Sequence, residues 1–267
     1  MQSLIETRAG VRCLVIGSGS LPVVYMHGFG GDLMHWHRSA RLIARRAPWC
    51  RQLLLELPGH GASDSVLPST VATVAGCLLA TLLELTGGAP PYLIGHSLGG
   101  LVALQLAGML AVPPLGLALF NSGMSLRIHP DIVSQAERGS WNEQFLRDGF
   151  GADTELAVID QVVAGFFAVR LEHQPLATLW KADDDVVERL NRAGVPILIG
   201  ADQNDRIVSS RKSEELARTF PQAITASFPN SCHYPHLTRT TDVAAAIYRH
   251  LLTGHGNGVE LGSPGIA

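Results

Sequence analysis

The residues best suited to chemistry lie at 95–100, where the sequence GHSLGG fits the pattern Gly-x-Ser-x-Gly. An apolar run at 92–94 leads into this segment, and a helix-like run follows it from Leu101. In such a strand–turn–helix context the sharp turn exposes the serine hydroxyl, and glycines avoid side-chain clashes in the turn. The dipole of the following helix also favours negative charge that develops nearby. The pentapeptide alone also fits an ordinary Gly-rich turn, but its flanks favour Ser97 as a nucleophile.

A serine nucleophile needs a base, and the base needs an acid that orients it. On a sheet with a nucleophile elbow the acid and then the histidine follow later in the chain. Two loops that come after late apolar runs carry these residue types. The first contains Asp202 and Asp205, and the second contains His233 and His236. Chain order alone leaves both aspartates and both histidines open.

The elements that must position these residues alternate regularly along the chain. Apolar runs predict strands at 11–16, 22–26, 52–57, 91–95, 115–120, 195–200 and 223–228, and helical spacing predicts helices at 31–47, 71–85, 98–111, 209–220 and 237–252. Continuous apolar runs are typical of strands that are covered on both faces. Strand and helix in regular order therefore predict an α/β fold, with a mostly parallel central sheet flanked by helices.

One long segment, residues 122–192, breaks this alternation. It is polar and helix-prone, shows no strong strand signal, and holds most of the large aromatic side chains. We expect a helical cap, or lid, inserted into a core that comprises residues 1–121 and 193–253. Residues 254–267 contain five glycines and one proline, and we expect them to form a flexible tail.

Four segments in order resemble the α/β-hydrolase family, in its cofactor-free serine esterase and thioesterase branch. They are 27–31 (HGFGG), 57–63 (LPGHGAS), 95–100 (GHSLGG), and 205–208 (DRIV) followed by 233–236 (HYPH). The resemblance covers about residues 10–121 and 190–253, and it implies an α/β-hydrolase fold with a cap. Two residues depart from the family pattern: Glu56 replaces the usual aspartate, and Cys232 replaces the usual glycine before the histidine. We expect Cys232 to be a buried, inert thiol.

The resemblance implies a catalytic triad of Ser97, His233 and Asp205. In the family the acid stands directly before a run of the type Arg-Ile-Val, and the first histidine of His-x-Pro-His is the catalytic one. Asp202 is then expected to be a capping or solvated loop carboxylate. His236 is expected to be a structural histidine near the start of the last helix.

The resemblance also implies an oxyanion hole and suggests a substrate pocket. The oxyanion hole would use the backbone N–H groups of Phe29 and Leu98. Beside Phe29, aromatic residues of the predicted cap suggest an apolar acyl pocket: Trp141, Phe145, Phe150, Phe166 and Phe167. The alternative for each cap aromatic is that it holds the cap to the core.

The reaction implied by these residues is two-step acyl transfer through an acyl-enzyme. We expect hydrolysis of a carboxylic ester with a small or medium acyl group. Thioester, lactone and carbon–carbon cleavage use the same triad and stay open. Serine at the nucleophile position disfavours epoxide hydrolases, haloalkane dehalogenases and dienelactone-type hydrolases, which the family builds on aspartate or cysteine. A different class, a non-catalytic small-molecule-binding protein of the same fold, is also open.

Composition limits the other functions. Of the 267 residues, 46% are apolar and 16% charged, which excludes a disordered chain. A net charge of −3 without a basic patch argues against nucleic acid as a partner. No apolar run approaches the roughly 20 residues of a membrane span, and the first residues lack signal-peptide features, so we expect a cytoplasmic protein.

We expect neither a metal nor a cofactor. The closest histidine pair, His35 and His37, would point apart on a helix. The four cysteines contain no Cys-x-x-Cys pair, which argues against a cysteine-based zinc site. The expected partner is a small acyl substrate, and the protein is expected to be a monomer or a homodimer.

Overall fold

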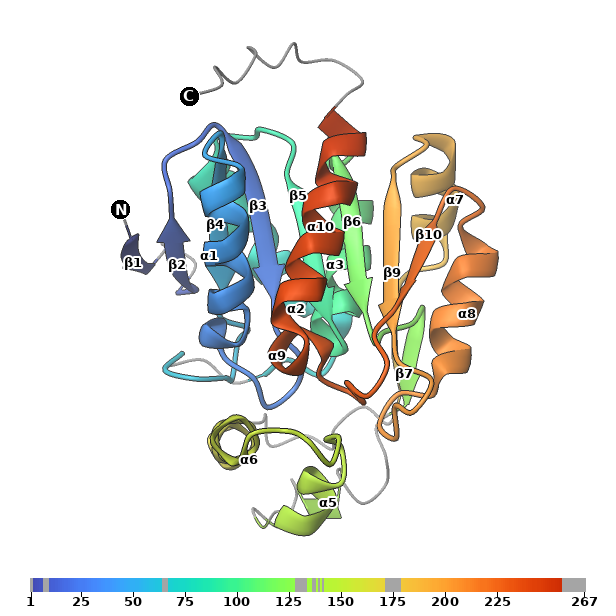
Figure 1. The fold of residues 1–267 in the computed structure, drawn as a ribbon. Helices are drawn as coiled ribbons and strands as arrows, with labels where there is room; N and C mark the ends of the chain where they lie inside the picture. Colours follow the sequence, from blue (N-terminus) through green and yellow to red (C-terminus); the bar gives the residue numbers. More distant parts are fainter. Residues whose placement is uncertain are drawn as a thin grey trace, which may run out of the picture.

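A large β-sheet forms the centre of the molecule (Figure 1). The structure is a computed structural model that describes residues 2–6, 10–63, 67–127, 134, 135, 138, 140, 142–170 and 179–255. Within these ranges eight strands form the sheet, in the order β1 (Gln2–Glu6), β2 (Arg12–Ile16), β4 (Cys50–Leu55), β3 (Leu21–Met26), β5 (Tyr92–His96), β6 (Gly116–Phe120), β9 (Ile197–Ala201) and β10 (Ile224–Ser227). The pairs β1–β2 and β2–β4 are antiparallel, and all later pairs are parallel. The predicted α/β fold with a mostly parallel sheet is therefore confirmed.

The first strand, β1, was not predicted. It pairs with β2 from Gln2 opposite Ile16 to Glu6 opposite Arg12, at the edge of the sheet. Its Leu4 is 53% exposed, so little apolar burial accompanies the pairing. Backbone pairing with β2 places no demand on side-chain type. The strand therefore forms without the continuous apolar run that would have predicted it.

Helices cover both faces of the sheet, and alternate strand residues point to opposite faces. On one side Val24 and Met26 pack under α2 (Val71–Thr86), α3 (Leu98–Met109), α7 (Asp185–Arg192) and α8 (Ser210–Thr219). On the other side Val23 and Tyr25 pack under α1 (His37–Arg46) and α10 (Thr240–His255). In Figure 1, α1 and α10 lie in front of the sheet.

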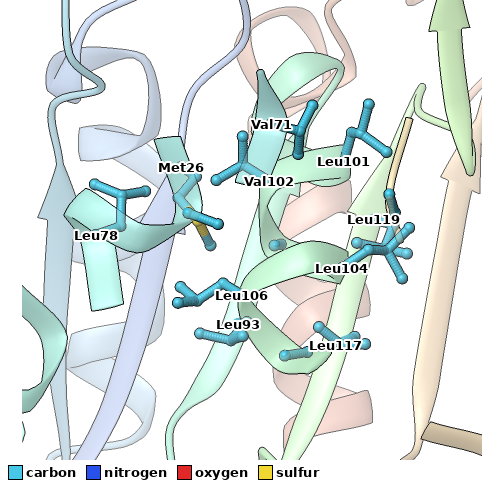
Figure 2. Close-up of a cluster of buried hydrophobic side chains, with 14 of the residues drawn as sticks. Met26, Val71, Leu78, Leu93, Leu101, Val102, Leu104, Leu106, Leu117 and Leu119 are labelled. Carbon is cyan, nitrogen blue, oxygen red and sulfur yellow. The ribbon is translucent and has the colours of Figure 1, made fainter. Parts of the chain in front are cut away.

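The central helix α3 fills the middle of the first core cluster. Figure 2 shows Leu101 and Leu104 of this helix close to Leu117 and Leu119 of β6. All four side chains are fully buried. Burying a leucine stabilises a fold by about 1.5–3 kcal/mol, so this packing holds the start of α3 rigidly at the sheet edge.

Two predicted helices are each divided in the structure. The segment predicted at 31–47 begins with a 3₁₀ turn, η1 (Leu33–Trp36), which Asp32 caps by accepting a hydrogen bond from the Met34 N–H at 2.7 Å. The segment predicted at 237–252 is preceded by a separate short helix, α9 (Pro235–Thr238). Arg239 between α9 and α10 has φ −122° and ψ 39°, which ends the first helical turn.

The segment between β6 and β9 contains short strands as well as helices. β7 (Ser125–Arg127) pairs antiparallel with β8 (Leu179–Lys181), two short strands in a segment that shows no strong strand signal in the sequence. Strands of three residues are too short to show a periodic pattern, and their pairing joins distant parts of the chain. Helices α5 (Glu143–Arg147) and α6 (Leu156–Phe167) lie beyond the carboxyl ends of the parallel strands (Figure 1).

The predicted division into core, cap and tail stays a prediction. Helix α7 belongs to the segment predicted as cap, yet its Val186 and Leu190 pack in the same core cluster as α3. Residues 256–267 of the predicted tail lie outside the described residues. Among the helices of the described ranges, none combines the length and apolar character that a membrane crossing requires.

Candidate active site

Ser97 occupies the sharp turn between β5 and α3. Its backbone has φ 52° and ψ −119°, a conformation that costs energy for a residue with a side chain. The Ser97 N–H donates to the Phe120 carbonyl at 2.9 Å, which fixes the turn to the neighbouring strand. A Cβ at Gly95 would lie 2.2 Å from the Gly99 oxygen, and one at Gly99 would lie 2.3 Å from the His27 oxygen. The strand and helix therefore approach closely enough that both positions require glycine.

His233 and Asp205 form a buried hydrogen-bonded pair. His233 Nδ1 lies 2.8 Å from Asp205 Oδ2, and because a carboxylate can only accept, Nδ1 carries the proton. The other carboxylate oxygen, Oδ1, accepts from the backbone N–H groups of Ile207 at 2.8 Å and Val208 at 2.9 Å. Burial acts to raise the pKa of Asp205, but His233 and the hydrogen bonds to the carboxylate outweigh it, and the pKa lies below its usual value. Asp205 is thus ionised, and His233 Nε2 is left as a proton acceptor.

Asn121 also holds this pair, and sequence reasoning missed it. Its side-chain amide donates to Asp205 Oδ2 at 2.7 Å and to the Cys232 carbonyl at 3.0 Å. Asn121 follows β6 directly and adopts φ 47°. Its place at the carboxyl end of a central strand was the only available signal, and no motif surrounds it.

Asp202 is a capping carboxylate, which is one of the two roles predicted for it. It is buried, so the solvated alternative is wrong. Its Oδ2 accepts from the backbone N–H groups of Ser231 and Cys232, both at 2.7 Å, and its Oδ1 accepts from the Asn204 N–H at 3.0 Å. Asp202 therefore joins its own loop to the loop that carries His233, a contact that depends on how two distant loops meet.

The two departures from the family pattern have local structural consequences. Cys232 has φ 49°, the left-handed region where glycine is favoured, which is consistent with the usual glycine at this position. Its thiol is buried. Burial raises the pKa of this thiol, and the negative charge of Asp202 raises it further. Glu56 pairs with Arg12 at 2.9 Å and accepts from the Ala62 N–H at 3.1 Å. It thereby joins the loop at 58–62 to β2.

The loop that follows β3 carries Phe29 and is fastened by His27. The Leu57 N–H donates to His27 Nε2 at 3.0 Å, so His27 Nδ1 bears the proton and donates to the Gly28 carbonyl at 2.8 Å. Burial, reinforced by nearby His60, lowers the pKa of His27 well below its usual value. This neutral ring locks the backbone on which the predicted oxyanion donor of Phe29 lies.

Two further histidines lie beneath His233. His96 Nε2 is 2.7 Å from the His233 carbonyl, to which it donates, and its ring centroid is 4.3 Å from that of His236. His236 is buried in α9, near the predicted start of the last helix. Burial lowers the pKa of both rings well below the usual value, so both are neutral. Among the described residues no three His, Cys, Asp or Glu side chains are arranged to hold a metal ion.

Five predicted site residues line one pocket together: Ser97, His233, Phe29, Leu98 and Phe166. Asp205 lies behind His233, outside the lining. The Leu98 N–H, at the first turn of α3, has no hydrogen-bond acceptor within the described part of the chain. The pocket can therefore place a substrate carbonyl beside a serine hydroxyl, an imidazole and a backbone donor.

The walls of this pocket are largely apolar. Besides Phe29 they include Leu126, Leu146, Phe166, Trp180 and Tyr234. Phe166 of α6 is buried, and its ring centroid lies 5.5 Å from that of Phe29. Sequence reasoning missed Leu126, Leu146, Trp180 and Tyr234. β7 and β8 carry Leu126 and Trp180, α5 carries Leu146, and the His233 loop carries Tyr234, so the pocket depends on how these distant segments meet.

The other predicted pocket aromatics have different outcomes. Phe167 is 53% exposed and does not line the pocket, so its assignment was wrong: adjacent residues on a helix point about 100° apart. Phe150 stacks on Tyr234 with ring centroids 4.4 Å apart and supports the wall from behind. Trp141 and the side chain of Phe145 lie outside the described part of the chain.

One family model and two curated proteins are similar to this chain. A family model described as "Alpha/beta hydrolase family" matches residues 23–246. The acetyltransferase component of the acetoin cleaving system of Cupriavidus necator is 27% identical over 90% of this chain and 66% of its own length. A 2-succinyl-6-hydroxy-2,4-cyclohexadiene-1-carboxylate synthase of Salmonella agona is 32% identical over 49% of this chain and 50% of its own. The chain thus spans less than two thirds of each relative.

Solved structures share the fold at lower sequence identity. An esterase from Thermogutta terrifontis has a TM-score of 0.75 and 21% identity, covering 96% of this chain and 99% of its own. A putative aryl esterase from Burkholderia cenocepacia has a TM-score of 0.75 and 19% identity, covering 96% of this chain and 100% of its own.

Proposed function

This chain belongs to the alpha/beta hydrolase family, and we propose that it is a serine hydrolase that cleaves the carboxylic ester of a small or medium acyl substrate. The observation that carries the proposal is the buried hydrogen bond of 2.8 Å between His233 and Asp205, behind a pocket that His233 and Ser97 line together. Two solved structures with the same fold, the esterase of Thermogutta terrifontis and the putative aryl esterase of Burkholderia cenocepacia, support the choice of reaction.

In the first half of the reaction, Ser97 Oγ attacks the ester carbonyl carbon while His233 Nε2 removes the hydroxyl proton. Asp205 keeps the second imidazole proton on Nδ1 and stabilises the imidazolium that forms. The tetrahedral intermediate then collapses. The bond to the alcohol oxygen breaks, His233 returns its proton to that oxygen, and Ser97 stays acylated.

In the second half, His233 Nε2 removes a proton from water, which attacks the acyl-enzyme carbonyl. Collapse of this intermediate returns the proton to Ser97 and releases the carboxylic acid. Both intermediates carry an oxyanion, for which the backbone N–H groups of Leu98 and Phe29 are the proposed donors. One such donor is worth about 2.7–4 kcal/mol to an acyl-transfer transition state. The locked backbone around His27 supports this role, because preorganised donors need not move during the reaction.

The pocket walls support an apolar acyl group as the bound part of the substrate. Phe29, Phe166 and Trp180 line the pocket beside Ser97 and His233. Burying a methylene on such a surface contributes about 0.8 kcal/mol. The proposed short or medium acyl length is tested by the chain-length series below.

The experiment that tests the proposal compares p-nitrophenyl ester turnover by the wild type, Ser97→Ala and Ser227→Ala. Ser227 is exposed on the edge strand β10 and serves as the matched control. We expect Ser97→Ala to lose at least about a thousandfold in kcat and Ser227→Ala to retain wild-type turnover. Undiminished turnover by Ser97→Ala, or none by folded wild type with any chain length, would contradict the proposal.

A parallel comparison tests the leaving group. Oxygen esters and thioesters of the same acyl chain share the acyl-enzyme, so a common deacylation rate shows that both pass through it. We expect the oxygen ester to have the higher kcat/KM. A clear preference for the thioester would reassign the protein to thioester hydrolysis.

A further inference from the structure

Two arginines line the same pocket as Ser97 and His233. Arg127 is the last residue of β7, and Arg206 follows Asp205 in the loop after β9. Within the described chain no aspartate or glutamate lines this pocket. Its charged side chains are therefore positive only, beside walls that are otherwise mostly apolar.

Neither guanidinium group is engaged by another described residue. In the described residues, Arg127 and Arg206 have no side-chain hydrogen bond and no ion pair. Other arginines do: Arg12 pairs with Glu56 at 2.9 Å, and Arg239 pairs with Asp242 at 2.6 Å. The donors of both pocket arginines are thus available to a ligand.

The nearest carboxylate in sequence, that of Asp205, makes no ion pair with Arg206. Asp205 directs Oδ2 to His233 and Asn121, and Oδ1 to the backbone N–H groups of Ile207 and Val208. Asp205 is buried, whereas the Arg206 side chain is exposed and lines the pocket. The loop therefore carries Asp205, whose carboxylate binds His233, next to Arg206, whose guanidinium group faces the pocket.

We infer that the natural substrate is an ester that also carries a free carboxylate, which Arg127 and Arg206 bind. This inference rests on the proposed function. A guanidinium group offers paired N–H donors that match the two oxygens of a carboxylate. Apolar walls strengthen the attraction relative to bulk water. A neutral ester would lie against the same two guanidinium groups without offering them a charged hydrogen-bond acceptor. We therefore expect it to be the poorer substrate.

Two matched ester pairs test where the carboxylate lies. Monoethyl adipate and ethyl 6-methylheptanoate differ by a carboxylate or an isopropyl group at the far end of the acyl part. Butyryl glycolate and isobutyl butyrate differ in the same way in the alcohol part. Acid release in a pH-stat gives kcat/KM for each ester. We expect the charged member of at least one pair to be favoured about tenfold.

The arginines are then changed one at a time. Arg127→Gln and Arg206→Gln should each reduce the preference for the charged ester, and added salt should reduce it in the wild type. Arg211→Gln is the matched control, because Arg211 is exposed on α8 and does not line the pocket. It should leave the preference unchanged. Equal or better turnover of the neutral member in both pairs, or a preference that neither pocket substitution alters, would overturn the inference and leave the proposed function standing.

A binding measurement separates the inference from catalysis. Calorimetric titration of Ser97→Ala with monoethyl adipate and with butyryl glycolate reports binding without turnover. Binding that Arg206→Gln weakens about tenfold in the Ser97→Ala background, and that Arg211→Gln does not, supports carboxylate binding by the pocket arginines, and it does so independently of whether the wild type hydrolyses esters. If neither monoethyl adipate nor butyryl glycolate binds to Ser97→Ala, the inference is overturned.

Discussion

His96 Nε2 lies 2.7 Å from the backbone carbonyl of His233. The residue that precedes the predicted nucleophile thus supports the main chain of the predicted base. Both rings are buried, with centroids 4.7 Å apart. This buried hydrogen bond therefore joins the β5–α3 turn to the loop after β10.

Removing this contact should slow the reaction more than it weakens substrate binding. We expect His96→Ala to lower kcat about tenfold with little change in KM, because a hydrogen bond of about 1 kcal/mol holds the His233 backbone in place. His96→Gln, which keeps an N–H donor, should recover part of the loss. Steady-state kinetics with a thermal unfolding control checks this. A folded His96→Ala protein with wild-type kcat would show that His233 holds its position without His96.

The two loop aspartates should respond very differently to amidation. Asp205→Asn puts an amide beside His233 Nδ1 and favours the wrong imidazole tautomer, so we expect kcat to fall by about 10⁴-fold with the fold retained. Asp202→Asn should instead cost about 1–3 kcal/mol of stability, because the neutral amide binds the Ser231 and Cys232 N–H groups more weakly. Measuring kcat and the free energy of unfolding for both variants tests the assignment. The opposite pattern would make Asp202 the acid.

Adjacent phenylalanines on α6 provide a matched pair for the pocket. Phe166 lines it, whereas Phe167 is more than half exposed. Phe166→Ala should shift the preference of p-nitrophenyl esters toward longer acyl chains, and Phe167→Ala should leave it unchanged. Equal chain-length profiles for the wild type and a folded Phe166→Ala protein would remove Phe166 from the substrate pocket.

Buried neutral histidines should make the fold sensitive to mild acid. Burial lowers the pKa of His27, His96 and His236 well below the usual value, and that of His60 to about 4. In the unfolded chain these rings have the ordinary histidine pKa of about 6.5. Below that pH the unfolded state binds more protons, so the stability is fully present above the unfolded pKa and is lost as pH falls toward the folded pKa. Each ring contributes up to about 1.4 kcal/mol per pH unit.

Denaturant unfolding between about pH 7 and pH 5 checks this expectation. Asp205, whose pKa is also lowered, does not interfere, because its contribution is lost only below about pH 4. His60→Gln should reduce the pH slope by up to one proton. A free energy of unfolding that is flat over this range would mean that these histidines titrate alike in both states.

The central sheet was predictable because its strands are buried on both faces. Every residue of β3 and β6 is buried, so both strands show a continuous apolar run in the sequence. β1, at one edge of the sheet, lacks such a run. β7 and β8 are three residues each and find one another only after the chain folds back.

The candidate site was predictable where a local motif accompanies the residue, and not elsewhere. Ser97 stands in a pattern that the tight β5–α3 turn itself requires, and the resemblance selected Asp205 and His233. Asn121 and the pocket arginines carry no local pattern. Their roles depend on which loops meet at the carboxyl edge of the sheet, and that is decided by tertiary packing.

The most direct test of the account is covalent labelling with a fluorophosphonate. Such a reagent forms a phosphorus–oxygen bond to an activated serine and releases fluoride, so it reports the nucleophile independently of the natural substrate. We predict one adduct, located on Ser97 by peptide mass spectrometry, with ester turnover lost in proportion to labelling. Folded protein that turns over esters while Ser97 stays unlabelled would contradict the account.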